Sequence, residues 1–493
     1  MGIVLRQSIK GSITQYFGIL VGYVNLLYVI PYCLSPEYNG LLRLVLETAT
    51  FFALFAQAGV PNAIPRFGPE FRSIGKERLL MHFSLLVPFM TTTAFSILYF
   101  LFFRDIFNKQ LELKSPLFLR YEFWLIPITL SIVYQNVLEN LIANYYRITV
   151  SKLVREVFLR LGLTAVSLIT IYKTMDLSEF LGMISVVYLA GALILLAYLL
   201  LISKKNKTYH VNSSGKAPWG KIGTFMALIL ISGLGTNLVN KLDIFMVSSQ
   251  IGLTENAIYS TAFLITMVME VPSRSFQQIM APIVSEAIHY NNTRKISWAY
   301  KKSSSGQTLA SLIIFSVLLL NAQWIFSSMP DSKVYSLGYV LIIFLGLAKL
   351  FDAFTGINGL ILANSKYYYV GIYFTIALAI LAILLNLAFI PRYGLNGVAY
   401  STALSIFLYN LILLLFVWYR FKVHPFSASS LKLIMYLALS ASIILIQYFT
   451  GNISFISSFL FSTAYVGLLF LLLLRIPILR EIKMMLNRLL TRF

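Results

Sequence analysis

The chain has 493 residues, of which 58% are hydrophobic and only 12% are charged, and its mean hydropathy is +0.80. A soluble domain carries about 25% charged residues, and a soluble protein of this length could not hide so much apolar surface. The composition therefore predicts an integral membrane protein and excludes a soluble enzyme. The net charge of +21 is typical of a membrane protein with basic cytoplasmic loops, so we expect no nucleic-acid partner.

The sequence has no pattern that predicts a metal site or catalytic chemistry. The single cysteine, Cys33, excludes an internal disulfide and a cysteine-based metal cluster, and the four histidines are scattered. Neither a phosphate-binding Gly-x4-Gly-Lys-Ser/Thr loop nor a His-Glu-x-x-His motif occurs. We therefore expect no cofactor and no enzyme. Active transport would have to use an H⁺ or Na⁺ gradient, or the substrate's own gradient.

Fourteen apolar stretches are long enough to cross a membrane as helices, since a span needs about 20 mostly apolar residues. They are continuous apolar blocks, which favour helices over the alternating strands of a β-barrel. The expected fold class is all-α integral membrane, with about 14 transmembrane helices. In chain order the expected spans are 13–34, 41–62, 79–103, 119–141, 157–175, 179–203, 221–249, 256–277, 305–329, 336–363, 367–390, 395–418, 430–449 and 455–475.

The distribution of basic residues predicts the orientation of these spans. Alternate connections between these spans, starting with the N-terminal segment, hold 24 Lys and Arg residues, whereas the other set holds 5. Because basic connections stay in the cytoplasm, we expect both termini to be cytoplasmic. The first apolar stretch is long enough to span the membrane, so no cleavable signal peptide is expected.

A weak internal repeat predicts two related halves. Asn39 and Pro65 lie 26 residues apart around the second span, and Asn256 and Pro282 repeat this spacing 217 residues later. Repeated halves around a central pathway are typical of secondary transporters. The expected organisation is two pseudo-symmetric six-helix lobes (1–203 and 221–422), a basic cytoplasmic linker (204–220), two additional spans (423–475) and a basic amphipathic tail (476–493).

Charged residues within the spans are candidates for a substrate-binding cavity, because each costs at least about 2.5–3.5 kcal/mol at the centre of a membrane helix. Most come as opposite charges three or four residues apart, which places both on one helix face, whereas Lys241 and Asp243 point to different sides. The alternative is that such pairs only neutralise each other. The cavity candidates are Arg43, Glu47, Lys241, Asp243, Glu270, Arg274, Lys349 and Asp352.

A polar stripe closes the fourth span. It contains Gln135, Asn136, Glu139 and Asn140, followed by Asn144. Amide and carboxylate groups suit the hydroxyls of a sugar, so the stripe is a second candidate for substrate binding. The alternative is a helix end that emerges at the cytoplasmic surface.

Two segments resemble a known family of transporters. The stretch 384–403, LLNLAFIPRYGLNGVAYSTA, resembles a signature of bacterial polysaccharide (O-antigen-type) flippases, with an Asn-Leu pair, Ile-Pro-x-Tyr-Gly and Gly-x-Ala. The segment 240–262 resembles the family's Asp-containing end of the seventh span and its Ala-x-Tyr entry to the eighth, at Asp243, Ala257 and Tyr259. Related MATE-like drug exporters and peptidoglycan lipid flippases of the same superfamily share this architecture.

The resemblance implies a substrate and a mechanism. The family moves undecaprenyl-pyrophosphate-linked oligosaccharide from the inner to the outer leaflet of the bacterial cytoplasmic (inner) membrane, for O-antigen and lipopolysaccharide biosynthesis. Its two lobes alternate around a cationic cavity. The cations Arg43, Lys241, Arg274 and Lys349 would then offset the pyrophosphate charge, and the acids would set the cavity geometry or couple H⁺ or Na⁺.

The same resemblance implies the partners, which are the lipid-linked glycan, membrane lipids and other polysaccharide assembly proteins. Two alternatives remain at this point. One is a multidrug or cation antiporter of the same superfamily, which would prefer acidic cavities. The other is a membrane glycan polymerase or ligase, which tends to need a sizeable outer loop, and the longest expected outer connection, 104–118, is short.

Overall fold

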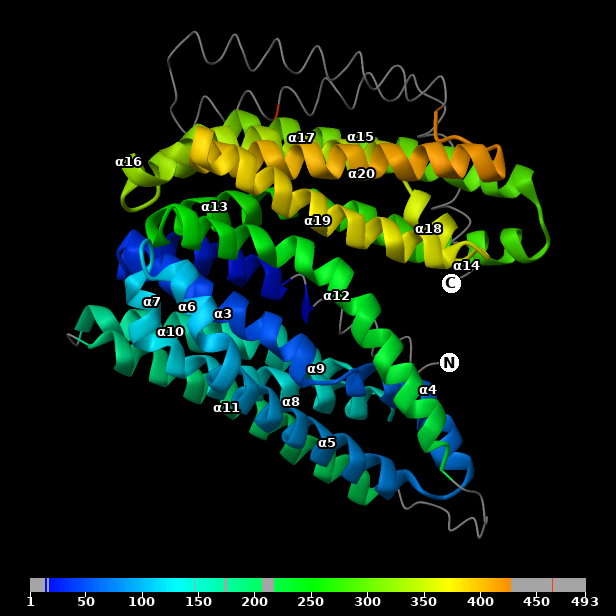
Figure 1. Cartoon of the computed structure of the whole chain (residues 1–493), viewed down its shortest axis with the longest axis horizontal. Coiled ribbons are helices and arrows are strands. Elements are labelled where there is room, and N and C mark those ends of the chain that lie inside the picture. The colour runs from blue at the N-terminus through cyan, green and yellow to red at the C-terminus, as the bar shows by residue number, and fades with distance from the viewer. Residues whose placement is uncertain are drawn as a thin grey trace. The chain divides into compact units, whose positions relative to one another are not determined.

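The computed structural model describes residues 14–15, 17–145, 147–172, 175–205, 217–426 and 463, and every regular element within these ranges is a helix. Internal contacts divide the chain into two compact units, residues 1–257 and 258–493, and Figure 1 shows long helices lying side by side within each unit. The predicted all-α class is confirmed. The last two expected spans and the tail 476–493 lie outside the described residues.

The first unit is organised around α8, which packs against α3, α4, α5 and α11. Ser35 caps the N-terminus of α3, because its hydroxyl accepts a hydrogen bond of 3.4 Å from the backbone N–H of Tyr38. The proline that follows Ser35 also favours the start of a helix. Its elements are η1 (Asn25–Val29), α2 (Ile30–Cys33), α3 (Pro36–Ala56), α4 (Val60–Ser73), α5 (Glu77–Leu98), η2 (Tyr99–Phe103), α6 (Arg104–Leu111), α7 (Pro116–Tyr121), η3 (Glu122–Trp124), α8 (Leu125–Ala143), α9 (Thr149–Leu153), η4 (Val154–Phe158), α10 (Leu159–Tyr172), α11 (Leu177–Lys205) and α12 (Trp219–Gln250).

The helix α12 contacts α3, α4 and α6. It therefore belongs to the first compact unit, although the sequence places it at the start of the second lobe. The expected lobe boundary at 204–220 stays a prediction.

The second unit is centred on α17, which packs against both α15 and α20. Its last two long helices, α19 and α20, form an antiparallel pair, and Gly394 between them has a φ of +57°, a left-handed conformation that favours glycine. After α13 (Leu253–Met267), which crosses the boundary between the units, the elements are α14 (Glu270–His289), α15 (Thr293–Ser327), α16 (Ser332–Tyr335), η5 (Ser336–Gly338), α17 (Tyr339–Thr355), α18 (Asn358–Ala363), α19 (Tyr368–Tyr393) and α20 (Leu395–Phe421).

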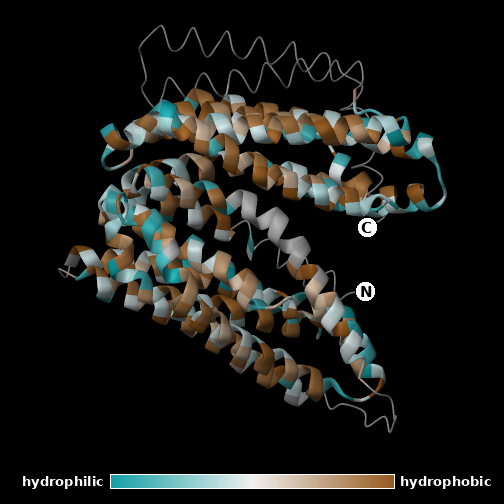
Figure 2. Ribbon diagram, in the orientation of Figure 1, coloured by the Kyte–Doolittle hydropathy of each residue, from teal (hydrophilic) through white to brown (hydrophobic). Residues whose placement is uncertain are grey.

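Eight helical stretches among the described residues are long and apolar enough to cross a membrane, and a shorter apolar helix covers Phe17–Cys33. Figure 2 shows apolar residues along the long helices and hydrophilic residues gathered near their ends. In the apolar windows of Glu77–Phe103 and Tyr368–Tyr393 only 17% of the residues are buried, so these helices present apolar side chains outward, as lipid-facing helices do. The expected number of fourteen spans is not confirmed.

The two segments of the predicted repeat are both interrupted helices. The second expected span is α3 followed by a break and α4, and the eighth is α13 followed by a break and α14. Asn39 and Asn256, which mark the repeat, are both fully buried. Asn256 Nδ2 donates a hydrogen bond of 3.0 Å to the carbonyl of Gly40, the residue after the first marker. The two marked positions therefore meet, which supports a repeat with structural meaning.

The break between α3 and α4 rests on two residues with positive φ. Ala58 has a φ of +50° and Gly59 a φ of +75°, and Gln57 is fixed beside them because its side-chain oxygen accepts a hydrogen bond of 3.1 Å from Asn136. A Cβ atom on Gly59 would lie 2.9 Å from the carbonyl oxygen of Met226 in α12. Glycine is therefore required there by both conformation and space.

We expect Gly59→Ala to destabilise the protein by at least about 1–2 kcal/mol, because it adds left-handed strain and a clash. The matched control is Gly223→Ala, which lies on α12 near Met226, where an added methyl group would have no neighbouring atom within 4 Å. The measurement is the thermal midpoint of the detergent-solubilised protein, which is monitored by fluorescence-detected size-exclusion chromatography. Equal midpoints for both variants would contradict this account of the break.

Candidate functional site

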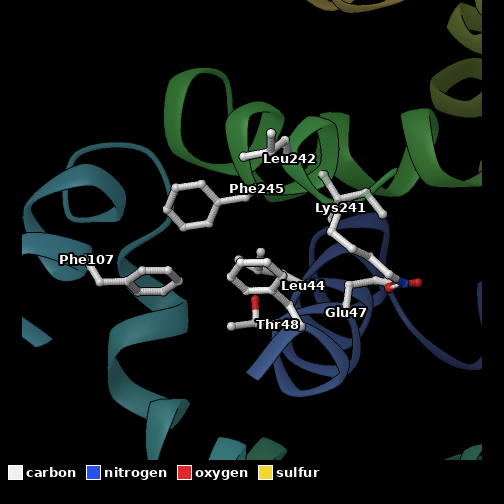
Figure 3. A pocket seen from close by; sticks show the side chains of 9 residues that line it. Leu44, Glu47, Thr48, Phe107, Lys241, Leu242 and Phe245 are labelled. Atoms are coloured by element: carbon white, nitrogen blue, oxygen red, sulfur yellow. Dashed lines mark hydrogen bonds and ion pairs between the residues drawn. The ribbon is translucent and has the colours of Figure 1, made fainter. Parts of the chain in front are cut away.

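A cavity of about 180 Å³ lies in the first unit between α3 and α12, with α6 along one side (Figure 3). Its wall is mainly apolar and aromatic, with one hydroxyl and one pair of opposite charges. This combination suits a ligand with both apolar and charged parts. The lining residues are Leu44, Glu47, Thr48, Phe51, Phe107, Lys241, Leu242, Ile244 and Phe245.

The charged part of the cavity is an ion pair between two helices. Lys241 Nζ of α12 donates to Glu47 Oε2 of α3, and the side chains are 24% and 33% exposed, respectively. The pair carries no net charge, which lowers the free-energy cost of holding both groups at membrane depth. Because an ammonium has three donors, Lys241 can bond a second acceptor without leaving Glu47.

The aromatic part of the cavity depends on α6. Phe107 of α6 packs on Phe245 of α12 with ring centroids 4.6 Å apart. At the start of α6, Arg104 forms a 2.6 Å ion pair with the buried Glu122. Beyond its end, the Ser115 hydroxyl donates to the carbonyl of Ser248 at 2.6 Å. These bonds hold the connection 104–118 against the cavity, and no spacing rule in the sequence singled out Phe107, since aromatic residues make up 15% of the chain.

Arg43 and Asp243 are buried outside the cavity wall. Arg43 is 7% exposed, and its Nε donates to Asn39 Oδ1 at 3.2 Å, while Nη2 donates to the carbonyl of Leu26 at 3.4 Å. Asp243 is 4% exposed and is not among the residues that line the cavity. The structure therefore pairs Glu47 with a lysine of another helix, whereas the sequence pairs it with Arg43 four residues away on the same helix.

The second unit holds a comparable lysine–glutamate pair. Lys349 Nζ of α17 donates to Glu270 Oε1 of α14, and Arg274 Nη2 donates to Glu270 Oε2 at 2.8 Å. Lys349 is the most buried of the three, with a side chain 11% exposed, and its ammonium lies 5.6 Å from the ring centre of Phe263. Two cations share one carboxylate, so this cluster carries a net positive charge.

Asp352 accepts a hydrogen bond from α20, whereas the hydrogen bond of Lys349 goes to α14. Asn410 Nδ2 of α20 donates to Asp352 Oδ1 at 3.0 Å, and the Asn410 oxygen accepts bonds from Thr355 Oγ1 at 3.0 Å and from Asn358 Nδ2 at 3.3 Å. Asn410 is 1% exposed. Carboxylate, amide and hydroxyl oxygens are the donors that hard cations prefer. Within the described residues, no cluster of three or more His, Cys, Asp or Glu side chains is placed to hold a metal ion.

Two amides of the predicted polar stripe bind neighbouring helices. Gln135 Nε2 donates to the carbonyl of Tyr188 in α11 at 2.7 Å, and Asn136 Nδ2 donates to Gln57 at the break after α3. A third amide, Asn140, bonds to the carbonyl of Asn136 one turn before it at 2.9 Å. These groups serve the packing of α8.

The acid of the stripe is also paired within the first unit. Glu139 Oε2 accepts a 2.9 Å ion pair from Arg155, whose guanidinium also lies 3.5 Å from Asn136 Oδ1. Arg155 is 56% exposed, so this end of the stripe lies at the surface of the unit. A sugar-binding role for the stripe stays a prediction that these bonds do not favour.

The helical fold, with paired charges inside apolar helices, defines a multi-span membrane protein. Solved structures give the class of fold. The chain resembles the lipid II flippase MurJ in an inward closed conformation, with a TM-score of 0.71 and 15% sequence identity, over 94% of this chain and 97% of MurJ. It also resembles an inward-facing multidrug resistance MATE family transporter of the MOP superfamily, with a TM-score of 0.65 and 18% identity, over 82% of this chain and 94% of that one.

A third structure with this fold is a MOP superfamily transporter from Pyrococcus furiosus, with a TM-score of 0.56, 15% identity and coverage of 85% and 95% of the two chains. No family model matches the sequence, and a comparison with curated proteins finds no match. The chain therefore has the fold of these MurJ and MATE structures, and the predicted all-α, MATE-like fold class is confirmed.

We expect Lys241→Met to lower the thermal midpoint, because it leaves the Glu47 carboxylate unpaired in an apolar cavity, at a cost of about 1–3 kcal/mol. The double variant Glu47→Gln/Lys241→Met removes both charges and should recover most of the loss. Lys109→Met, at an exposed lysine of α6, is the control. A single variant as stable as the control, by thermal unfolding in detergent, would show that the pair contributes nothing to the fold.

Proposed function

We propose that this chain is a flippase that moves undecaprenyl-pyrophosphate-linked oligosaccharide across the bacterial cytoplasmic membrane by alternating access, with both termini in the cytoplasm. Its product would serve surface polysaccharide biosynthesis, as for O-antigen and lipopolysaccharide. The observation that carries the proposal is the likeness to a lipid II flippase over nearly the whole length of both chains. The resemblance of 384–403 and 240–262 to polysaccharide flippases supports the same substrate class.

The charges of the second unit favour an anionic substrate. Glu270 is shared by Lys349 and Arg274, so these three groups carry one excess positive charge. The nearby Asp352 carboxylate offsets this charge only in part, because it is bonded to Asn410. A pyrophosphate carries at least two negative charges, and charge-assisted bonds from lysine and arginine would offset the loss of its hydration. In the first unit, Lys241 lies beside the apolar wall of the cavity, and this wall suits the lipid part of the substrate.

Asp352 is the group we assign to ion coupling. Its carboxylate is partly buried, is bonded to Asn410, and interacts electrostatically with Lys349 of the same helix. Binding of H⁺ or Na⁺ there would change the charge of α17, the helix that also carries Lys349. Membrane lipids and other polysaccharide assembly proteins are the further partners that this function implies.

The second candidate function is a drug or cation antiporter, and it is favoured by the likeness to a MATE transporter. A cationic drug would compete with the lysines for Glu47 and Glu270, whereas an anion would compete with the glutamates for the lysines. The excess positive charge near Glu270 favours the anion. A glycan polymerase or ligase is less favoured, because the connection 104–118 consists of the short helices α6 and α7 held against the first unit.

The test is the sidedness of the lipid-linked oligosaccharide in inner-membrane vesicles of known orientation, from cells with and without the gene. The flippase predicts that the oligosaccharide accumulates on the cytoplasmic face without the gene, and that restoring the gene relieves the block. Normal outward movement with unpolymerised repeat units outside would instead indicate an enzyme. An unchanged set of glycan lipids would favour the antiporter.

We expect Lys349→Gln and Asp352→Asn each to reduce glycan export at least about tenfold at an unchanged protein level. Lys349→Gln is a suitable test because Glu270 keeps its ion pair with Arg274, so we expect only a small loss of stability. The control is Lys333→Gln, at an exposed lysine of the same unit. Export is measured as surface glycan per molecule of protein, and wild-type display in both variants would exclude a role for this region in the pathway.

A further inference from the structure

Three cations gather at one end of the second unit. Lys366 directly precedes Tyr367 and the start of α19, while Arg420 and Lys422 lie at the end of α20. Because α19 and α20 are antiparallel neighbours, the start of one lies beside the end of the other. All three side chains are exposed, and we call this set of three residues the basic edge.

Two tyrosine rings join the cations of the basic edge. The Lys366 ammonium lies 5.2 Å from the ring centre of Tyr367, and the Arg420 guanidinium lies 5.2 Å from the same ring and 5.5 Å from that of Tyr419. The Lys422 ammonium lies 5.3 Å from the Tyr419 ring. Cation–π contacts hold exposed cations in place without neutralising them.

Among the residues that the structure describes, no carboxylate pairs with the basic edge. The sequence has no Asp or Glu between Asp352 and Glu481, and within the described part of the chain none of the three cations forms an ion pair. Four basic residues elsewhere in the described chain do have acidic partners, at 2.6–3.0 Å. These pairs are Arg72–Glu77, Arg155–Glu139, Arg160–Glu156 and Lys295–Glu286.

The backbone at Lys422 adopts a left-handed conformation. Its φ is +56°, and its N–H ends α20 by donating to the carbonyl of Trp418 at 3.0 Å. Glycine is the usual residue at such a helix end, because a residue with a Cβ is destabilised in this conformation. Lysine therefore occupies a position where glycine would be less strained, and it adds a positive charge there.

The basic edge borders an apolar stripe with a belt of aromatic residues. Tyr368, Trp418 and Tyr419 are 58%, 54% and 67% exposed, and exposed tyrosine and tryptophan mark the headgroup level of a membrane. From there an exposed stripe follows one face of α19 at helical spacing. It consists of Tyr369, Tyr373, Ile376, Ile380, Leu384 and Leu387.

We propose that the basic edge binds the phosphate headgroup of an anionic phospholipid, with the acyl chains along the exposed stripe of α19. Lys366, Arg420 and Lys422 supply the charge, and the aromatic belt sets the depth. A phosphate of the transported substrate has related chemistry, but the basic edge shares no residue with the cavity or the Glu270 cluster, and the stripe gives a bulk lipid a place for its chains. The inference does not depend on the proposed function.

The experiment measures the thermal midpoint of the full-length purified chain with added phosphatidylglycerol or phosphatidylcholine of the same acyl chains. We expect phosphatidylglycerol to stabilise the wild type more, and high salt to remove the difference. Each cation near a membrane surface contributes about 1 kcal/mol of attraction to anionic lipid, or about fivefold in affinity. The triple variant Lys366→Gln/Arg420→Gln/Lys422→Gln should therefore need at least tenfold more phosphatidylglycerol for the same shift.

Two further variants keep the test decisive. Lys422→Gly relieves the left-handed strain, so we expect a protein at least as stable without lipid but about fivefold weaker in its response to phosphatidylglycerol. Arg392→Gln, at the opposite end of α19, is the matched control and should respond like the wild type.

An unchanged preference for phosphatidylglycerol in both Lys422→Gly and the triple variant would overturn the proposal. So would a response to inorganic pyrophosphate that equals the response to the lipid in the wild type and is lost in the triple variant, because it would assign the edge to the substrate. The measurement needs no transport assay, so its failure and the failure of the flippase proposal are distinguishable.

Discussion

The main constraint on this structure is the free-energy cost of an unpaired charge inside a membrane helix, which is at least about 2.5–3.5 kcal/mol for each group. Each compact unit lowers this cost with an ion pair between a lysine of one helix and a glutamate of another. The pairs are Lys241 with Glu47 and Lys349 with Glu270. These bonds tie α12 to α3 and α17 to α14. Both lysine side chains stay partly exposed, at 24% and 11%, so an incoming anion could reach them.

The partners of these lysines were beyond the reach of sequence reasoning. Helical spacing shows which residues share a face of one helix, so it identified Glu47, Lys349 and Glu270 as candidates. It paired Glu47 with Arg43 and Lys349 with Asp352, because residues of other helices do not enter a spacing rule. The actual partners lie 194 and 79 residues away, and only the packing of the helices brings them together.

The fold itself was predictable to a larger extent. The first twelve expected spans fall on described helices, since a helix that faces lipid must be apolar over its whole length. The break at Ala58 and Gly59 was missed, because a left-handed alanine leaves no sequence signal. The polar stripe of α8 shows the same limit: Gln135 and Asn136 have the chemistry of a sugar site, but their bonds go to α11 and to Gln57.

The most direct measurement is transport by the purified chain in proteoliposomes that contain a pyrophosphate-linked oligosaccharide in the inner leaflet only. A membrane-impermeant lectin reports the fraction that reaches the outer leaflet. A flippase that uses the lysine pairs predicts rapid exposure with the wild type, slow exposure with Lys349→Gln and none in protein-free vesicles. Exposure no faster than in protein-free vesicles, in a preparation of correctly folded wild-type protein under an H⁺ or Na⁺ gradient, would contradict it.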